Sequence, residues 1–500
     1  MIETTVPLPA ELWGTVPAPA QAPLLALVAL LRSENATLRL ENAALGEQNG
    51  ALQERVRDLE ARLGQDSSNS SRPPSSDPPQ ATAKGKRRSA PSGRKRGGQP
   101  GHPGSFRSLL PVEQVDAVVV VVPEVCRWCQ QPFAEGKARR HGRVWRHQVV
   151  ELPLPAVRVT EYQLEARRCA HCGKRTRATL PAGVPHRAFG PQLAAVVAML
   201  TGRYRLSRRE VQQLLVDLWG VTLSLGSVTN QEQAQSTALA PVVAEVRAAV
   251  QQAGLANVDE TSWRQEKRRA WLWVAVTPHL TAFLIDRSRG GVALEALLGE
   301  QFGGVVGSDR WSVYKRYPAK RRALCWAHLK RDFQGLVDRG GEAEPIGRWG
   351  LAEIARLFGL WHRYRAGEVS RKEVPRQLVP IQARLGRLLW RGEESADQKA
   401  AGLCRELNRW WPALWTFTRV EGVEPTNNSA ERALRPGVLW RKGSFGSDSE
   451  AGSRYAERML TVVATCRQQG RRLLDFLVAA GEAAQRGLPA PSLLPAPQEG

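Results

Sequence analysis

Long apolar runs are absent from this sequence, and acidic side chains are in short supply. No stretch of about 18 consecutive apolar residues occurs, which excludes a membrane-spanning helix. The apolar stretch 23–31 is too short to span, follows Glu3 and Glu11 and has no basic segment before it, so we expect no signal peptide. Asp and Glu total 48 against 71 Lys and Arg, a net charge of +23. We therefore expect a polyanionic partner, with an anionic membrane surface as the second choice, and a cytoplasmic protein.

Cysteine is scarce as well, with seven residues in a chain of 500, which argues against a disulfide framework and for a reducing compartment. Four of the seven form two Cys-x-x-Cys pairs, Cys126 with Cys129 and Cys169 with Cys172. Two such pairs can complete a tetrahedral, structural Zn²⁺ site. The runs 118–122 and 144–154 predict strands beside or between the pairs, so we expect a zinc-ribbon-like module over 111–185. Buried structural thiols, the alternative, would not need to be paired.

A leucine repeat marks residues 24–64. Leucines recur every seven residues at position d, with Val, Asn or Leu at position a. The d residues are Leu24, Leu31, Leu38, Leu45, Leu52 and Leu59, and the a residues are Val28, Asn35, Asn42, Asn49, Val56 and Leu63. The pattern predicts a parallel coiled coil whose asparagine pairs fix the register, and hence a homodimer or higher oligomer. An amphipathic helix packed on its own domain is the alternative.

Low-complexity segments flank this repeat. Residues 1–23 are rich in Pro and Ala, 65–110 in Ser, Pro and Gly, and the tail 483–500 in Pro, and we expect all three to be disordered. Within the second segment, 84–107 carries eight basic residues and no acid. This composition favours a flexible arm that binds phosphates over a plain linker. Its candidate DNA-binding residues are Arg87, Arg88, Arg94, Lys95 and Arg96.

Residues 186–250 favour helices. An amphipathic run, 207–219, begins with Ser as a helix N-cap and ends before Gly, and a second helical run covers 226–235. Helix, short turn and helix resemble a helix-turn-helix, although bundle packing produces the same pattern. Two basic residues at its front are candidate DNA contacts, Arg208 and Arg209.

Strand-like runs and acidic residues coincide from residue 251 onwards. The runs near 256–259, 270–277, 281–286, 303–308 and 322–326 predict strands, and 292–301 predicts a helix. Asp259 ends the first strand, Asp309 follows the fourth, and Glu431 lies in the helix-like run 429–434. Two strand-end aspartates and a helix-borne glutamate can hold two Mg²⁺ ions. A single Asp at a strand end is more often a turn former or a cap, but Arg and Lys surround these three, as expected of a site that binds a polyanion.

A long segment separates Asp309 from Glu431. Residues 335–420 are rich in Leu, Trp and Arg with helical spacing, which predicts a helical insertion between 251–334 and 421–482, the two parts of one core. We expect most of its tryptophans to be buried. They are Trp349, Trp390, Trp410, Trp411 and Trp415.

Several ordered motifs carry a resemblance to a known family. They are Cys325-Trp326-Ala327-His328, Asn427-Asn428-x-Ala430-Glu431-Arg432-x-Leu434-Arg435-Pro436, Arg441-Lys442, and the N-terminal segments 68–77 and 97–102. From about residue 30 to about residue 480 the chain resembles the DDE transposases of the insertion-sequence family IS66. The resemblance implies an RNase H-like catalytic core with Asp259, Asp309 and Glu431 as its triad. It also implies a Cys-x-x-His pair after the second Asp, matched by Cys325 and His328.

Basic residues next to these motifs complete the expected site. We expect Cys325 to pack in the core, while His328 and Arg331, three residues apart on one helix face, approach the scissile phosphate. The candidate DNA contacts in the second part of the core are Arg432, Arg435, Arg441 and Lys442.

Together these features predict a multidomain α/β protein. It combines an RNase H-like core and its helical insertion with a coiled coil, a zinc-ribbon-like module and helix-turn-helix-like helices. The expected function is a DNA transposase that binds terminal inverted repeats and performs Mg²⁺-dependent strand cleavage and transfer, and the resemblance suggests accessory proteins from the same element. The alternatives are a non-catalytic repressor derived from a transposase and a metal-dependent nuclease.

Overall fold

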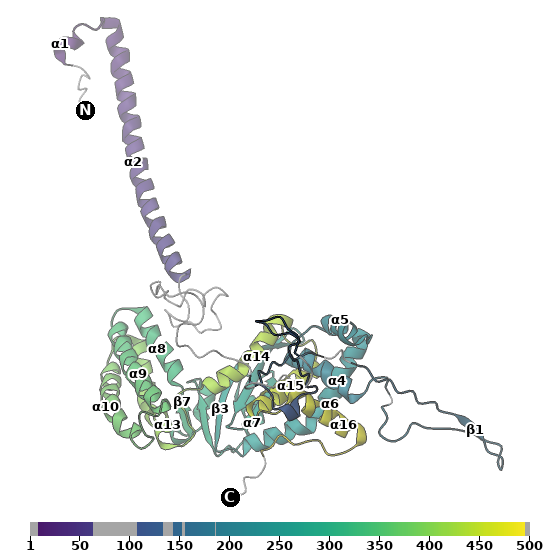
Figure 1. Ribbon diagram of the computed structural model, residues 1–500. Helices are drawn as coiled ribbons and strands as arrows, with labels where there is room; N and C mark the ends of the chain where they lie inside the picture. The colour runs from purple at the N-terminus through teal and green to yellow at the C-terminus, as the bar shows by residue number, and fades with distance from the viewer. Residues whose placement is uncertain (1–8, 64–107, 134–143, 153–155, 186, 496–500) are drawn as a thin grey trace. The chain divides into compact units, whose positions relative to one another are not determined.

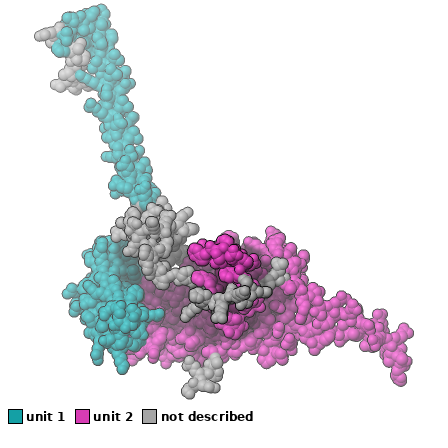
Figure 2. Space-filling model, in the orientation of Figure 1, with its two compact units in different colours: residues 1–87, 328–408 teal, residues 88–327, 409–500 magenta. Residues whose placement is uncertain are grey.

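The computed structural model describes residues 9–63, 108–133, 144–152, 156–185 and 187–495 (Figure 1). The chain divides into two compact units, coloured separately in Figure 2. The first unit comprises Met1–Arg87 and His328–Asn408, and the second comprises Arg88–Ala327 and Arg409–Gly500. Each unit is described by itself below.

A five-stranded sheet forms the centre of the second unit (Figure 1). Its strands are β3 (Leu255–Gln265), β4 (Arg268–Val276), β5 (Thr281–Asp286), β6 (Val305–Ser308) and β7 (Arg322–Leu324), in the order β5-β4-β3-β6-β7. The first three strands are antiparallel to one another, whereas β6 runs parallel to β3 and β7 parallel to β6. The predicted strands are therefore present, and β3 extends six residues beyond its expected end to a tight turn at Glu266 and Lys267.

Helices cover both faces of this sheet. On one face, Val258, Trp273 and Leu284 pack against α6 (Leu225–Gln251) and α7 (Gly291–Leu298). On the other face, Leu272, Val274 and Phe283 pack against α14 (Asn428–Ser444) and α15 (Glu450–Gln468). Because residues alternate between the faces of a strand, the near-continuous apolar runs of β4 and β5 serve both layers. The result is a three-layer α/β/α arrangement.

Helix α15 also caps the exposed edge of the sheet. Alternate backbone N–H groups of β5 donate to its side chains: Ile285 to Glu457 (3.0 Å), Phe283 to Thr461 (3.0 Å) and Thr281 to Thr465 (3.2 Å). The match is geometric, since four residues of helix and two residues of strand both advance by roughly 6 Å. An edge strand that would otherwise offer a row of free donors is thereby satisfied within the chain.

The helices that precede the sheet follow the predicted pattern. They are α4 (Pro191–Ala198), the π-helical turn Met199–Arg203 and α5 (Arg208–Trp219). Ser207 caps α5 in a reciprocal capping box with Glu210, and Gly220 ends it with a φ of 65°. Helix α6 continues sixteen residues beyond its predicted end at Gln235, because buried valines at helical spacing extend as far as Val250.

The predicted helical insertion is present as a series of helices. It comprises α8 (Trp326–Arg339), α9 (Ala343–Arg365), α10 (Val374–Gly392), α11 (Gln398–Arg409), α12 (Trp411–Leu414) and α13 (Thr416–Arg419). Within the first unit, α9 packs closely on α8, since a side chain at Gly347 or Gly350 would overlap α8 at Phe333. Of the five tryptophans that were expected to be mostly buried, two are buried, Trp410 and Trp415, and two are half-buried, Trp349 and Trp411. Trp390 is 67% exposed on α10.

The predicted disorder of the two ends of the chain is contradicted by the residues that the structure describes there. Residues 1–23 include the short helix α1 (Ala10–Trp13) and the start of α2 (Ala18–Leu63), so the predicted disorder is wrong there. The predicted disorder of 483–500 is also wrong up to residue 495, because α16 (Leu473–Arg486) covers its start and Leu493 is fully buried in the core. Residues 1–8, the basic arm 65–107 and residues 496–500 lie outside the described residues.

The strands expected beside the cysteine pairs do not form. Residues 118–122 are exposed and form no strand, and the described residues 144–152 form no strand either. The two predicted strands are therefore wrong. A run of valines becomes a strand only when another strand satisfies its backbone groups, and none of the described residues does so here. The strands of this segment are β1 (Ala166–Arg168) and β2 (Arg175–Arg177), an antiparallel pair around Cys169–Cys172.

Candidate active site

Two aspartates lie at matching positions on neighbouring parallel strands. The register pairs Asn257 of β3 with Gly307 of β6, and Asp259 and Asp309 each follow two residues later. Adjacent strands are separated by about 4.8 Å, so the two side chains project from neighbouring points. Glycine is required at 307, because a β-carbon there would overlap the side chain of Asn257.

Asn427 fixes the helix that carries Glu431. Its side-chain amide donates to the carbonyl of Val258 (2.8 Å), and its backbone N–H donates to the Cys325 Sγ (3.1 Å). The residue is buried, and α14 begins immediately after it, with Glu431 in the first turn. The start of α14 is thus bonded to the residue that precedes Asp259, and a Glu431 carboxylate oxygen lies within 4.8 Å of the Cys325 Sγ.

Asp259 lies close enough to Asp309 and Glu431 for their charges to act on it. The pKa of Asp259 is raised well above its usual value, first by burial and then by the charges of Glu260, Asp309 and Glu431. One hydrogen bond opposes this shift, from the backbone N–H of Glu260 to the Asp259 Oδ1 (2.9 Å). The structure thus brings Asp259, Asp309 and Glu431 into one electrostatic environment, as their positions in the sequence led us to expect, while their role as metal ligands stays a prediction.

A fourth carboxylate, Glu260, was missed in the sequence. Its side chain accepts hydrogen bonds from the hydroxyl of Tyr314 (2.7 Å) and from Nη2 of Arg289 (2.9 Å). The Arg289 guanidinium lies over the rings of Trp271 (4.4 Å) and Trp311 (4.1 Å). Burial raises the pKa of Glu260, and both hydrogen bonds oppose the rise. The acidic pair Asp259-Glu260 was the only signal in the sequence, since its partners are 29 and 54 residues away.

The expected basic residues differ in what they can reach. Arg432 and Arg435 are exposed on α14, one helical turn apart, and Lys442 is exposed near its end. Arg441 is instead directed to β3, where it donates to Thr261 Oγ1 (3.3 Å) and to Ser262. Its structural bonds leave it less suited to DNA contact than the others.

The other predicted DNA contacts lie on different elements. Arg208 and Arg209 are exposed in the first turn of α5, and Arg208 forms an ion pair with Glu232 (2.8 Å). His328 and Arg331 follow Cys325 on α8, in its first two turns. Cys325 is buried, as expected. The candidate contacts in the basic arm lie outside the described residues; they are Arg87, Arg88, Arg94, Lys95 and Arg96.

Each cysteine pair forms a tight knuckle. The N–H of Cys126 donates to the carbonyl of Gln131 (2.8 Å), and that of Cys169 to the carbonyl of Lys174 (2.8 Å). Backbone N–H groups of the following turn lower the pKa of both first thiols, those of Cys129 and Cys172 foremost. A lowered thiol pKa suits a metal ligand, because the thiolate is the form that binds. Among the described residues the two pairs do not meet as one cluster of ligand atoms, so the zinc site stays a prediction.

In the part of the chain that the structure describes, no helix is long and apolar enough to cross a membrane. Exposed basic residues lie on α5 and α14, and none of the described residues forms a membrane-spanning helix.

Comparison with known proteins assigns the family. Residues 20–108 match a family of unknown function, DUF6444. An uncharacterized protein of Sinorhizobium fredii, y4qI, is 28% identical over 234 residues, which cover 42% of each chain. A second one, y4hP, is 25% identical over 391 residues, 70% of this chain and 69% of the relative. The Transposase IS66 family matches residues 186–455, more than half of the chain and all three acidic residues of the site. This protein belongs to the Transposase IS66 family.

Proposed function

We propose that this transposase itself cleaves the ends of an insertion sequence and joins them to target DNA. The observation that carries the proposal is the convergence of three carboxylates, from β3, from the end of β6 and from the first turn of α14. Negative charges held close to Asp259 do not stabilise the fold, and carboxylates gathered in this way are expected where divalent cations bind. The strand order β5-β4-β3-β6-β7, with three antiparallel strands followed by two parallel ones, supports an RNase H-like core.

The residues present fit Mg²⁺. Asp259, Asp309 and Glu431 offer hard oxygen ligands, which Mg²⁺ prefers, and a bound cation would offset both causes of the raised pKa of Asp259, burial first and the neighbouring carboxylates second. When bound, two such ions supply Lewis acidity to the attacking and leaving oxygens of a phosphodiester. Arg289 and Tyr314 hold Glu260 and so position the part of β3 that carries Asp259.

The joining reaction balances without a covalent protein intermediate. A 3′-hydroxyl oxygen of the element end forms a bond to a target phosphorus and gives its proton to solvent. The bond from that phosphorus to the 3′-oxygen of the target strand breaks, and this leaving oxygen takes up a proton from solvent. The number of phosphodiester bonds is unchanged, so the protein has only to position and stabilise charge. Arg432 and Arg435, exposed on the helix of Glu431, would hold the strand that carries the scissile phosphate, and His328 would approach that phosphate from α8.

The cysteine knuckles are proposed to hold one structural Zn²⁺ and to help bind the terminal inverted repeats. Zinc would stabilise a segment that has little buried core of its own. We expect Cys169→Ser to abolish binding of the one zinc ion per chain, measured by elemental analysis of the purified protein. Cys404→Ser, a buried thiol on α11, is the matched control and should keep its zinc. Full zinc content in Cys169→Ser would contradict the assignment.

Helix α2 is proposed to pair two chains, and so two element ends. Every side chain from residue 29 to 57 is exposed, including the leucine seam at 31, 38, 45 and 52. A buried charge in this seam costs several kcal/mol per chain, so Leu38→Asp with Leu45→Asp should convert a dimer to a monomer in light scattering. Ala36→Asp with Ala44→Asp, outside the a and d positions, should leave the mass unchanged. A dimer that survives in the seam variant would assign oligomerisation to another surface.

The function itself is tested with DNA. The purified chain is given Mg²⁺, a duplex with the inverted repeats that flank its gene and a supercoiled target plasmid, with and without proteins encoded by the same element. Joined end–plasmid products support a transposase that performs strand transfer. Cleavage without joining would indicate a metal-dependent nuclease, and binding without either would indicate a repressor.

A further inference from the structure

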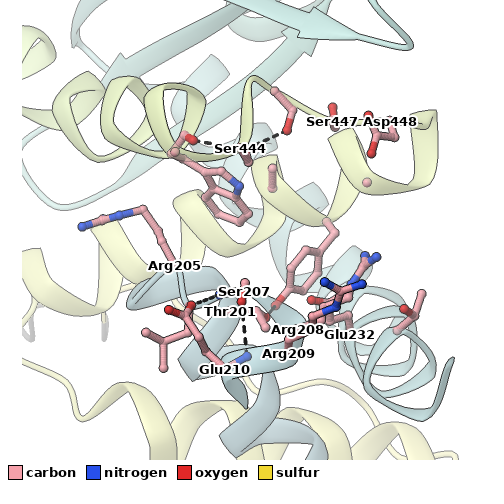
Figure 3. A pocket seen from close by; sticks show the side chains of 18 of the residues that line it. Thr201, Arg205, Ser207, Arg208, Arg209, Glu210, Glu232, Ser444, Ser447 and Asp448 are labelled. Carbon is pink, nitrogen blue, oxygen red and sulfur yellow. Dashed lines mark hydrogen bonds and ion pairs between the residues drawn. The ribbon is translucent and has the colours of Figure 1, made fainter. Parts of the chain in front are cut away.

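A cavity of about 870 Å³ lies in the second unit, beside the C-terminal end of α14, whereas Glu431 lies in the first turn of that helix (Figure 3). Its lining comes from the first turns of α5 and α6, the last turn of α14 and the turn that leads into α15. Arg205 and Ser207 lie on one side of it, and Ser444 and Ser447 lie on the other. The volume falls within the range of about 300–1,000 Å³ that is usual for small-molecule and cofactor sites.

The charged side chains of the lining leave two arginines available. Arg208 is paired with Glu232, and Glu210 is held by the backbone N–H of Ser207 (2.7 Å). Among the described residues Arg205 and Arg209 form no ion pair, and both are exposed. Asp448 adds one carboxylate at the opposite side. Two guanidinium groups facing one cavity are suited to a phosphate group.

The inner wall of the cavity is aromatic. Trp440 and Tyr455 pack edge to face, with ring centroids 6.2 Å apart, and both line the cavity. The hydroxyl of Tyr455 is already hydrogen-bonded to Thr201 Oγ1 (2.6 Å), so the ring is held in place. Leu206 and Leu225 add apolar surface. A rigid aromatic and aliphatic wall beside two arginines matches the two halves of a nucleotide, a flat base and a phosphate.

An exposed aromatic residue stands beside this cavity. Phe445 lies between the lining residues Ser444 and Gly446, and its side chain is 76% exposed. Its φ is 60°, in the left-handed region that a bulky residue rarely adopts, and its N–H is bonded to the carbonyl of Arg441 (2.8 Å). Residues with such strained backbone conformations are concentrated at functional sites, where the surrounding structure holds them. An apolar side chain presented in this way can occupy the space that a base leaves in a duplex.

Helix α14 connects the cavity to the candidate active site. Glu431 is in its first turn and Ser444 is its last residue. At 1.5 Å per residue these two positions are separated by roughly 20 Å along the helix, which is the length of about six base pairs. DNA held at Glu431 can therefore extend to the cavity on the same protein element.

We propose that this cavity receives one nucleotide unstacked from the DNA bound at the active site. Arg205 and Arg209 bind its phosphate, its base lies against Trp440 and Tyr455, and Phe445 takes the place of the base in the stack. The inference rests on the proposed function, since it needs DNA at Glu431. The ligand chemistry is a nucleoside phosphate, and the source is the DNA strand rather than the free nucleotide pool.

The test uses the full-length chain and duplexes of the element end, each with 2-aminopurine at one position. The protein carries Asp259→Asn, so that cleavage does not interfere. An unstacked base should raise the fluorescence roughly fivefold at one position, about four to eight base pairs from the cleaved phosphate. Gly443→Trp, which places an indole at an open position of the lining, should remove this rise. Gly359→Trp, at an exposed and open helical position of α9, should retain it.

Phe445→Ala provides a second variant, which removes an exposed side chain and leaves the core intact; it should reduce the rise by about half or more. No rise at any position, or a rise that neither variant changes, would overturn the proposal. Saturable binding of free 2-aminopurine deoxynucleoside monophosphate that Gly443→Trp abolishes, with no signal from DNA, would overturn the DNA source. Joining by the wild-type chain is measured in parallel, so loss of the proposed function and loss of unstacking are told apart.

Discussion

Asp259→Asn should abolish strand cleavage and joining while it increases the stability of the metal-free protein. Asn removes a charged metal ligand but keeps its size, so we expect activity to fall by about 1,000-fold or more. Binding of the element end, measured by fluorescence anisotropy, should change little because the DNA contacts are arginines elsewhere. Wild-type joining rates in this variant would remove Asp259 from the mechanism.

The stability effect follows from the sign of the pKa shift. Burial and the neighbouring carboxylates raise the pKa of Asp259 in the folded protein. A carboxyl group with a raised pKa favours the folded state while it is protonated, and this contribution is lost as the pH rises through the folded-state pKa. The melting temperature of Asp259→Asn should therefore exceed that of the wild type at neutral pH, and the two should converge below about pH 4.

Divalent metal should favour the wild type, whereas without metal Asp259→Asn should be the more stable of the two proteins. A cation that binds only the folded state raises the melting temperature, and the rise grows with the logarithm of its affinity. Mg²⁺ should therefore stabilise the wild type more than Asp259→Asn. Asp286→Asn is a suitable control, since Asp286 ends β5 on the same sheet and is not one of the three carboxylates of the site. Equal metal responses in all three proteins would place the cation elsewhere.

Much of the core was predictable because local pattern and tertiary environment agree there. The apolar run 281–286 became β5 at the predicted residues. The valines at 118–122 form no strand, although an apolar run favours one, because the run does not supply the partner strand that it needs. Leu493 lies in a Pro-rich tail that was predicted to be disordered, yet its side chain is fully buried. It packs into a core formed by residues distant in the sequence, which the local composition does not reveal.

The candidate site shows the same division. Asp259, Asp309 and Glu431 were found because their chemistry and the surrounding basic residues were visible in the sequence, and the resemblance to a family located them. The partners of Glu260 could not be found in that way. Arg289 follows β5 and Tyr314 follows β6, and both reach Glu260 of β3 only because the chain folds into the strand order β5-β4-β3-β6-β7. Residues that position a site through long-range contacts leave no local pattern.

Gly437→Ala tests whether close packing of α14 on the sheet positions Glu431. A β-carbon at 437 would overlap the side chain of Leu272, which is fully buried on β4 between the sheet and the helix. Leu272 has no free space to move into, so α14 should shift away from the sheet and carry Glu431 with it. A displacement of about 1 Å at a reacting centre costs up to 100-fold in rate, so we expect joining to fall by roughly 10- to 100-fold.

Two further variants separate this effect from general destabilisation. Gly443→Ala lies on the same helix where nothing lies within 4 Å of an added β-carbon, so it should keep wild-type activity. Adding Leu272→Ala to Gly437→Ala removes the overlapping methyl group and should restore part of the activity, even though Leu272→Ala alone destabilises the core by about 2–5 kcal/mol. Rescue of activity together with a fall in stability is an outcome that a purely structural role for Gly437 does not produce. If Gly437→Ala keeps full activity, or if the double variant is no more active than the single one, Glu431 is positioned by Asn427 and its hydrogen bonds alone.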